Sequence, residues 1–228
     1  MNAPSTNRAN TAPRFRDSVF MGLVSLLLLA SSASAAPPVD RIEPGKVQLN
    51  GWGGWQWGGA FSGDEGKIDI DSGPSFGTSV ELRVQDDGFA FISYSLQRTR
   101  GNMRFNDGTS SKFDLDVGYI QIGGVLDIPM SLHFVPYIGL SLGASYLSPR
   151  VADTKAKWFF AGSALAGAKF PITRHFGLRT QMRFLGTVIG GDTNFFCSSN
   201  GGATCGLHIS NTTGIIQGDI TGGLYLSF

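Results

Sequence analysis

Two residues near the C-terminus, His208 and Ser210, have the types and spacing that could support nucleophilic catalysis. Residues two apart in an extended strand point to the same face, so the imidazole and the hydroxyl would be neighbours. A histidine within hydrogen-bond reach of a serine is the arrangement that activates the hydroxyl for acyl transfer. The alternative is a loop histidine followed by the start of a strand, and from the spacing alone we favour this alternative.

The two cysteines of the chain, Cys197 and Cys205, lie in one glycine- and serine-rich stretch. An even number of cysteines in an exported chain predicts a disulfide, and closing so short a loop stabilises by roughly 2–3 kcal/mol in the chain-entropy model. A metal site would need more ligands than two thiols, and only His208 is near. We therefore predict a local disulfide, no metal site and no cofactor.

Eight charged residues alternate with apolar residues along the chain. Four are cationic and four are anionic: Arg83, Lys169, Arg179 and Arg183, against Glu81, Asp114, Asp116 and Asp219. Buried charges persist only when they are paired and hydrogen-bonded, and a set without net charge can pair completely. If the strands close into a barrel, this set predicts an interior filled by an ion-pair network. The alternative is a narrow channel for small solutes.

The elements that must position these residues are strands, and the last stretch of the chain shows their pattern most clearly. From 214 to the C-terminus every second residue is apolar or glycine, including Leu224, Leu226 and Phe228. A period of two predicts a strand with one apolar and one polar face. Seven further segments alternate in the same way, and we predict strands at 47–61, 75–85, 89–99, 113–126, 132–147, 158–170 and 175–188.

Short and long connections alternate between these eight segments. The long ones are predicted at 62–74, 100–112, 149–157 and 191–211. Tight turns at one rim and long loops at the other predict an all-β, eight-stranded antiparallel up-and-down transmembrane β-barrel. A further hairpin hidden in the long loops would raise the count to ten.

The fourth segment is the one whose alternation is interrupted. Leu115, Val117 and Tyr119 share its apolar face, and Asp114 and Asp116 the other. Its pattern shifts by one residue after that point, which predicts a β-bulge.

The first 35 residues have the composition of a secretory signal peptide. Arginines precede an apolar run at 20–30 that is too short to span a bilayer, and Ala33 and Ala35 form a cleavage motif. Cleavage after Ala35 would leave a periplasmic lead-in at 36–46 and a barrel domain at 47–228. It would lower Lys plus Arg from 18 to 15 and Asp plus Glu from 17 to 16, a balance that gives no reason to expect nucleic-acid binding.

The strand that ends on Phe228, together with PYIGLSLGASY at 136–146, resembles the small outer-membrane barrels of the OmpA membrane domain and OmpX kind. The resemblance implies a monomer in the cell outer membrane, with a structural or surface-binding role. It also implies that Leu224, Leu226 and Phe228 are a signal read by the outer-membrane assembly machinery.

The sequence from His208 to Asn211 reads H-x-S-N, which is similar to a motif of outer-membrane lipid A deacylases. By that resemblance His208 would be the base, Ser210 the nucleophile and Asn211 a neighbour of the oxyanion site. The acidic third member lacks a counterpart, because the only later carboxylate, Asp219, falls on the inward face. We predict no enzyme, and keep a lipid A hydrolase as an alternative.

Basic residues gather in the second and third long loops. Arginine binds phosphate through two hydrogen bonds, so we expect Arg100, Arg104 and Arg150 to contact lipopolysaccharide. Membrane lipid and lipopolysaccharide are thus predicted partners. The alternative is that the basic loops rest on the acidic first loop as ordinary solvated surface.

Overall fold

The computed structural model describes residues 45–64, 66–130, 133–150, 156–190, 193–198, 204–209 and 212–228, and the regular elements in these ranges are β-strands. Among the described residues, no helix has the length and hydropathy needed to cross a bilayer. The signal peptide predicted at 1–35 lies outside these ranges, as does most of the lead-in predicted at 36–46.

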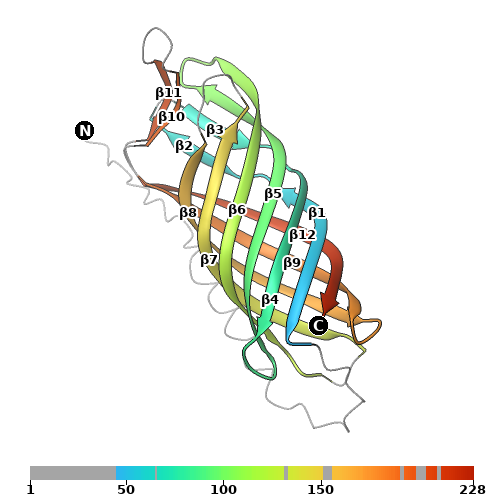
Figure 1. Ribbon diagram of the computed structural model, residues 1–228. Coiled ribbons are helices and arrows are strands. Elements are labelled where there is room, and N and C mark those ends of the chain that lie inside the picture. Colours follow the sequence, from blue (N-terminus) through green and yellow to red (C-terminus); the bar gives the residue numbers. More distant parts are fainter. Residues whose placement is uncertain are drawn as a thin grey trace, which may run out of the picture. The chain divides into compact units, whose positions relative to one another are not determined.

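Eight strands close into an antiparallel barrel, which Figure 1 shows. Each pairs with the next, and the last returns to the first. Closure leaves no open edge, so the backbone donors and acceptors of the wall pair within it. The predicted fold class is therefore confirmed. The eight strands are β1 (Val47–Trp57), β4 (Gly73–Arg83), β5 (Gly88–Phe105), β6 (Ser110–Asp127), β7 (Val135–Pro149), β8 (Lys157–Pro171), β9 (Phe176–Ile189) and β12 (Thr213–Ser227).

Four short strands extend one rim of this barrel. β2 (Ala60–Gly63) and β3 (Gly66–Ile70) form a hairpin, and β3 pairs with the C-terminal end of β5. β10 (Thr193–Ser198) and β11 (Thr204–Ile209) form a separate two-stranded sheet. The long loops predicted at 62–74 and 191–211 do contain hairpins, but the closed ring itself keeps eight strands.

The connection between β5 and β6 is much shorter than the loop predicted at 100–112. Both strands continue beyond the predicted ends, and only a turn around Gly108 remains, where a φ of 88° suits glycine. In this turn the Thr109 hydroxyl and backbone N–H donate to Asp107 Oδ1 over 2.6 and 2.8 Å. These hydrogen bonds, the hydroxyl's first, hold the pKa of the Asp107 carboxyl below its usual value.

The outer face of the wall is apolar and its inner face is polar through the middle of the barrel. Exposed apolar residues with a period of two are expected where the surroundings are hydrocarbon. The predicted orientation of the strands is confirmed for most of the wall. The outward set includes Phe76, Val80, Leu82, Ile92, Ile122, Leu140, Leu142, Phe160, Phe184, Ile216, Ile220 and Leu224, and the buried inward set includes Gln48, Asn50, Ser79, Ser93, Ser95, Gln97, Ser141 and Gln181.

For the first half of β6, the prediction of which side chains point outward is wrong. Leu115, Val117 and Tyr119 are buried inside, while Asp114 is exposed outside and Asp116 half-exposed. The ladders of β6 with β5 and β7 run without interruption, so the predicted bulge is absent from this strand. The apolar residues face inward here because the N-terminal half of β6 borders the interior apolar cluster near the rim, while its outer face carries ion pairs such as that of Asp116 with Arg150.

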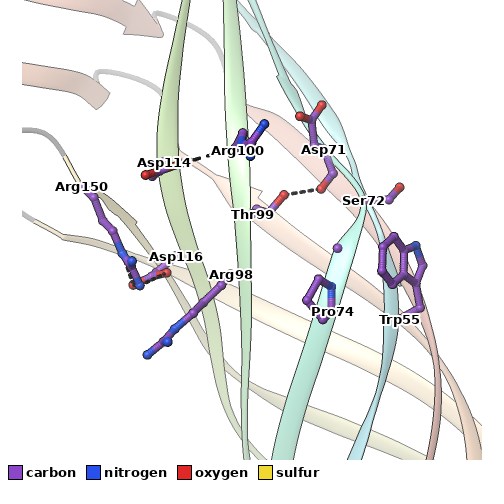
Figure 2. Close-up of a pocket in the computed structure, with 11 residues that line it drawn as sticks. Trp55, Asp71, Ser72, Pro74, Arg98, Thr99, Arg100, Asp114, Asp116 and Arg150 are labelled. Atoms are coloured by element: carbon purple, nitrogen blue, oxygen red, sulfur yellow. Dashed lines mark hydrogen bonds and ion pairs between the residues drawn. The ribbon is translucent and has the colours of Figure 1, made fainter.

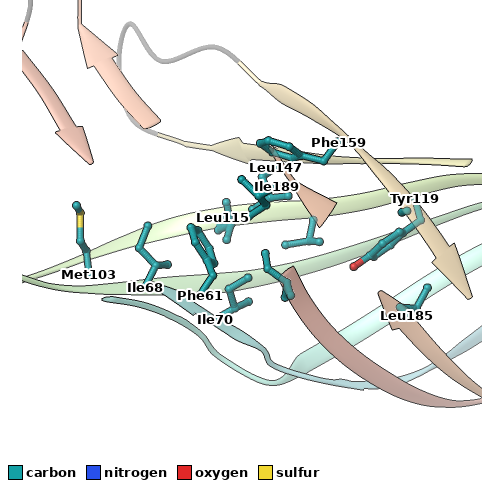
Figure 3. Close-up of a cluster of buried hydrophobic side chains, with 13 residues drawn as sticks. Phe61, Ile68, Ile70, Met103, Leu115, Tyr119, Leu147, Phe159, Leu185 and Ile189 are labelled. Carbon is teal, nitrogen blue, oxygen red and sulfur yellow. The ribbon is translucent and has the colours of Figure 1, made fainter. Parts of the chain in front are cut away.

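The interior is therefore layered along the barrel. Near the rim formed by β2 and β3, a cluster of apolar side chains fills it, as Figure 3 shows. A polar and ionic layer follows, and toward the short turns its charged side chains lie among a second apolar cluster. The first cluster comprises Phe61, Ile68, Ile70, Met103, Leu115, Val117, Tyr119, Leu147, Phe159, Ala161, Leu185, Ile189 and Ile215, and the second comprises Phe89, Phe91, Val125, Tyr137 and Leu165.

Several glycines of the wall, among them Gly167 and Gly177, are required by aromatic rings that lie across them. Gly167 is the cross-strand partner of Tyr137, and Gly177 is the partner of Tyr225. A β-carbon at either glycine would collide with the tyrosine ring. Aromatic side chains that cover a cross-strand glycine shield its backbone and fix the register of the pair.

Candidate functional site

The half of the barrel toward the short turns holds an ionic cluster contributed by four strands. Glu81 on β4 receives a hydrogen bond from the Arg179 guanidinium of β9 and lies 3.4 Å from Lys169 Nζ of β8. Lys169 Nζ is also 3.0 Å from Asp127 Oδ1 at the end of β6. Each of these side chains is less than a tenth exposed, so none is balanced by bulk water. The cluster ties together strands that are not neighbours in the wall.

A second ion pair lies farther toward the rim. Arg183 of β9 and Asp219 of β12 are direct cross-strand partners, and Arg183 Nε lies 3.1 and 3.0 Å from the two carboxylate oxygens. Arg183 also donates to Ser95 Oγ across the barrel over 3.3 Å. Arg183 is 2% exposed and Asp219 is fully buried. A buried pair with these additional bonds satisfies the condition under which internal charges are retained.

Aromatic rings also contact the buried cations. Arg179 Nε donates to the Tyr137 hydroxyl over 2.6 Å, and its guanidinium carbon is 4.5 Å from the centre of that ring. Lys169 Nζ lies 4.4 Å from the centre of the Phe89 ring. Cation–π contacts of this kind are strongest where water is excluded.

The interior has little free volume beside these charges. The cavity bounded by Trp52, Glu81, Arg179 and Arg183 measures about 10 Å³, which is near the space of one water molecule. The three cations Lys169, Arg179 and Arg183 are matched by three carboxylates, those of Glu81, Asp127 and Asp219. This arrangement braces the barrel and occupies its cross-section.

The structure brings together five of the eight charges predicted for this network: Glu81, Lys169, Arg179, Arg183 and Asp219. Arg83 faces inward at the end of β4, with its guanidinium 5.6 Å from the Phe89 ring. Asp114 and Asp116 are not part of the network, because they lie on the outer face of β6. Asp127 was missed because it falls in a segment predicted as a turn, although its phase relative to the polar Gln121 would have placed it inside.

Asp114 and Asp116 instead line a groove on the outer surface, which Figure 2 shows. We call this the boundary groove. It encloses about 370 Å³ between the outer faces of β4, β5 and β6. Arg150 holds Asp116 with contacts of 2.9–3.1 Å, whereas Arg100 Nε is 4.0 Å from Asp114. The lining residues are Trp55, Asp71, Ser72, Gly73, Pro74, Arg98, Thr99, Arg100, Asp114, Asp116 and Arg150.

The three arginines predicted to contact lipopolysaccharide occupy two places. Arg100 and Arg150 line the boundary groove. Arg104 lies nearer the tip of β5, outside the groove, and its Nε is 3.7 Å from Asp69 of β3. Arg98 was not singled out from the sequence, although it precedes Arg100 by two residues and therefore shares its face.

Of the residues predicted for catalysis and for a disulfide, the structure describes His208, Cys197 and Cys205. His208 is in β11, opposite Asn194 of β10, while Ser210 and Asn211 lie outside the described residues. Cys197 and Cys205 are direct backbone partners in the β10–β11 ladder. The two cysteines are therefore directly opposite each other on adjacent strands.

The C-terminal residue closes the barrel at the opposite rim. Phe228 N–H donates to Val47 O over 2.9 Å, and Val47 N–H donates to Phe228 O over 3.2 Å. The side chains of Leu224, Leu226 and Phe228 all point outward, and that of Phe228 is 65% exposed. The three predicted signal residues therefore form one apolar strip on the outer face of β12.

Comparison with known proteins agrees with this architecture. The family model described as "Outer membrane protein beta-barrel domain" matches residues 25–207. The structure is similar to Neisserial surface protein A (NspA), with 14% identity, a TM-score of 0.56, and 80% of this chain and 97% of that chain covered. It is also similar to OprG from Pseudomonas aeruginosa, with 12% identity, a TM-score of 0.50, and 83% and 99% covered. At such identities these similarities concern the fold. No curated protein sequence matches the chain.

Proposed function

The chain belongs to the outer membrane protein beta-barrel family, and from this membership we propose that it is a non-enzymatic surface protein with a closed interior. Its barrel would serve as a rigid membrane anchor, and the strands that continue past the apolar belt would carry the binding surface. The single observation that supports this proposal most is the ionic network inside the barrel, in which Lys169, Arg179 and Arg183 are paired with Glu81, Asp127 and Asp219 among the side chains that fill the interior.

The closed interior distinguishes this proposal from a small-solute channel. A permeating ion would have to separate Lys169 or Arg179 from the carboxylates that hold them, and it would find a cavity of only about 10 Å³ beside them. Eight-stranded barrels are wide enough only for their own side chains. The ionic layer therefore favours a structural role for the interior.

Single-molecule conductance in planar bilayers tests this proposal. We expect the purified, folded protein to insert without producing steady current steps of porin size, with detergent micelles alone as the baseline. Reproducible open steps that grow in proportion to the salt concentration would overturn the closed interior and favour the channel.

The proposal also excludes lipid A hydrolysis through His208 and Ser210. Cells that overproduce the protein should keep lipid A with its full set of acyl chains, as measured by mass spectrometry. Loss of one acyl chain in these cells, abolished by His208→Ala and by Ser210→Ala, would show that the chain is an enzyme.

We also propose two features of biogenesis and of the rim. A disulfide between Cys197 and Cys205 would lock the β10–β11 hairpin, which is supported by their direct backbone pairing. The outer-membrane assembly machinery would bind the exposed strip that ends at Phe228, because this strip lies on the strand that closes the barrel.

A further inference from the structure

We propose that the boundary groove binds a phosphate group on the sugar of an outer-leaflet glycolipid, and that Arg98 is its main contact. The proposal rests on the surface-binding role inferred above and assigns that role a site and a ligand class. The sequence predicted that the basic loops contact lipopolysaccharide, and this proposal assigns the contact to one groove and to Arg98.

The groove lies where the outer surface changes from apolar to charged. Along the outer face of β5, Ile92 and Tyr94 are followed by Arg98 and Arg100. Directly below, the hydroxyls of Tyr94 and Tyr146 meet at 2.8 Å on the outer surface. Tyrosines at this level mark the lipid–water interface of membrane barrels. The groove therefore faces the layer that contains lipid headgroups.

The same change occurs on the neighbouring strands. On β6 the exposed Ile122 and Ile120 are followed toward the rim by Asp116, and on β7 Tyr146 is followed by Arg150. Because β6 and β7 follow β5 in the wall, the change of character forms a continuous line across these three strands. A ligand in the groove would have its polar part above this line and its acyl chains below it.

Arg98 is the cation of the groove that remains available. Its cross-strand partner is Asp116, but that carboxylate is held by two nitrogens of Arg150. Arg100 retains only a 4.0 Å contact with Asp114. Within the described ranges the Arg98 side chain makes no hydrogen bond or ion pair, and Figure 2 draws it extending from β5 with no interaction marked. Its guanidinium can therefore offer both donors of its fork to a phosphate.

The other lining groups favour a sugar phosphate over a simple phospholipid. The carboxylates of Asp71 and Asp114 and the hydroxyl of Ser72 can bind sugar hydroxyls, which a phosphodiester headgroup lacks. Because the three arginines are matched by three aspartates, the groove has little net charge and cannot attract anions by its field alone. Recognition must come from directed bonds, which favours a ligand with phosphate and hydroxyls together.

Binding of defined lipids to the folded protein in detergent micelles tests the proposal. Native mass spectrometry would measure the bound fraction of diphosphoryl lipid A and of the same lipid with its phosphates removed. We expect the phosphorylated lipid to bind at least tenfold more tightly, and Arg98→Ala to reduce its affinity about tenfold, because one charge-assisted bidentate contact is lost. Arg98→Lys should retain part of the affinity.

The matched control is Arg174→Ala, which removes an exposed arginine at the opposite, short-turn rim and should leave binding unchanged. Each variant would be checked for the folded state by its heat-modifiable migration on gels. Equal binding of both lipids, or full affinity in Arg98→Ala, would overturn the proposal. Displacement of lipid A by millimolar inorganic phosphate would instead identify soluble phosphate as the ligand and also overturn it. None of these outcomes depends on conductance, so failure here is distinct from failure of the closed-interior proposal.

Discussion

Arg183 and Asp219 lie directly opposite each other on β9 and β12, and their side chains pair inside the barrel, away from bulk water. The pair joins the last two strands of the wall at mid-height. Because β12 also pairs with β1, the same strand carries both the buried charge and the closure of the ring. This ion pair is thus anchored on the strand that forms the seam of the barrel.

Removing one member of this pair should be costly. We expect Arg183→Ala to lower the free energy of unfolding by about 3 kcal/mol, because Asp219 would remain buried without a counter-charge. Urea titration in detergent micelles, followed by tryptophan fluorescence, measures the change. Arg174→Ala at the exposed turn is the control and should change stability by less than about 0.5 kcal/mol. Equal effects of the two variants would contradict the role of the buried pair.

Replacing both partners should be less harmful than replacing one. The variant Arg183→Met with Asp219→Leu removes the charges together and leaves no isolated ion. Buried ion pairs replaced by apolar groups of similar size are often close to neutral in stability. The same titration should place the double variant between the wild type and Arg183→Ala, and a double variant less stable than the single one would contradict this account.

Within the ionic cluster, removing the charge of Glu81 should destabilise the barrel more than removing that of Asp127. Glu81 pairs with both Arg179 and Lys169, whereas Asp127 pairs with Lys169 alone and lies at the end of β6. We therefore expect Glu81→Gln to destabilise the barrel by roughly 1–2 kcal/mol more than Asp127→Asn. Thermal unfolding by gel mobility would rank the two variants. A larger effect from Asp127→Asn would show that the turn-side bond is the dominant one.

The covered glycines should tolerate no side chain. In Gly177→Ala the new β-carbon would collide with the ring of Tyr225, so we expect a loss of roughly 1–3 kcal/mol in unfolding free energy. Gly222→Ala is the matched control, since Gly222 lies on the strand paired with β9 and has no atom within 4 Å of such a carbon. Similar stability of both variants, measured by urea titration, would exclude the collision as a constraint.

Removing the cysteine pair should loosen the 191–211 segment and leave the stability of the barrel unchanged. Mass spectrometry of the unreduced protein should show Cys197 and Cys205 linked, with no thiol available for alkylation. Cys197→Ser combined with Cys205→Ser should leave the stability of the barrel unchanged, because β10 and β11 form a separate sheet. Increased cleavage of the 191–211 segment by an added protease would reveal the lost constraint. Two reactive thiols in the mature protein would contradict the disulfide.

The terminal residue should affect the rate of assembly more than the final stability. Phe228→Ser keeps the backbone bonds to Val47 and removes an exposed ring. Pulse-chase labelling should show slower appearance of the heat-modifiable folded form in cells. Val84→Ser, a replacement of similar exposure just after the end of β4, is the control. An unaltered rate in Phe228→Ser would contradict its role as an assembly signal.

The sequence by itself determined the barrel and, for most strands, which side chains point inward and which outward. A period of two assigns each residue to one side of a sheet, and in a single surrounding medium the apolar side must face that medium. On this basis the inward positions of Glu81, Lys169, Arg179, Arg183 and Asp219 could be predicted from the alternation of β4, β8, β9 and β12.

Only the tertiary structure decided the facing of β6, the partners of the charges and the position of the boundary groove. The medium outside β6 changes along its length, so Leu115 turns inward and Asp116 outward although the alternation of the strand is unbroken. The pairing of Arg150 with Asp116, which leaves Arg98 available, depends on the register in which β5, β6 and β7 pair side by side. The period of two indicates which residues share a face of a strand, but it does not indicate where along the strand the lipid ends.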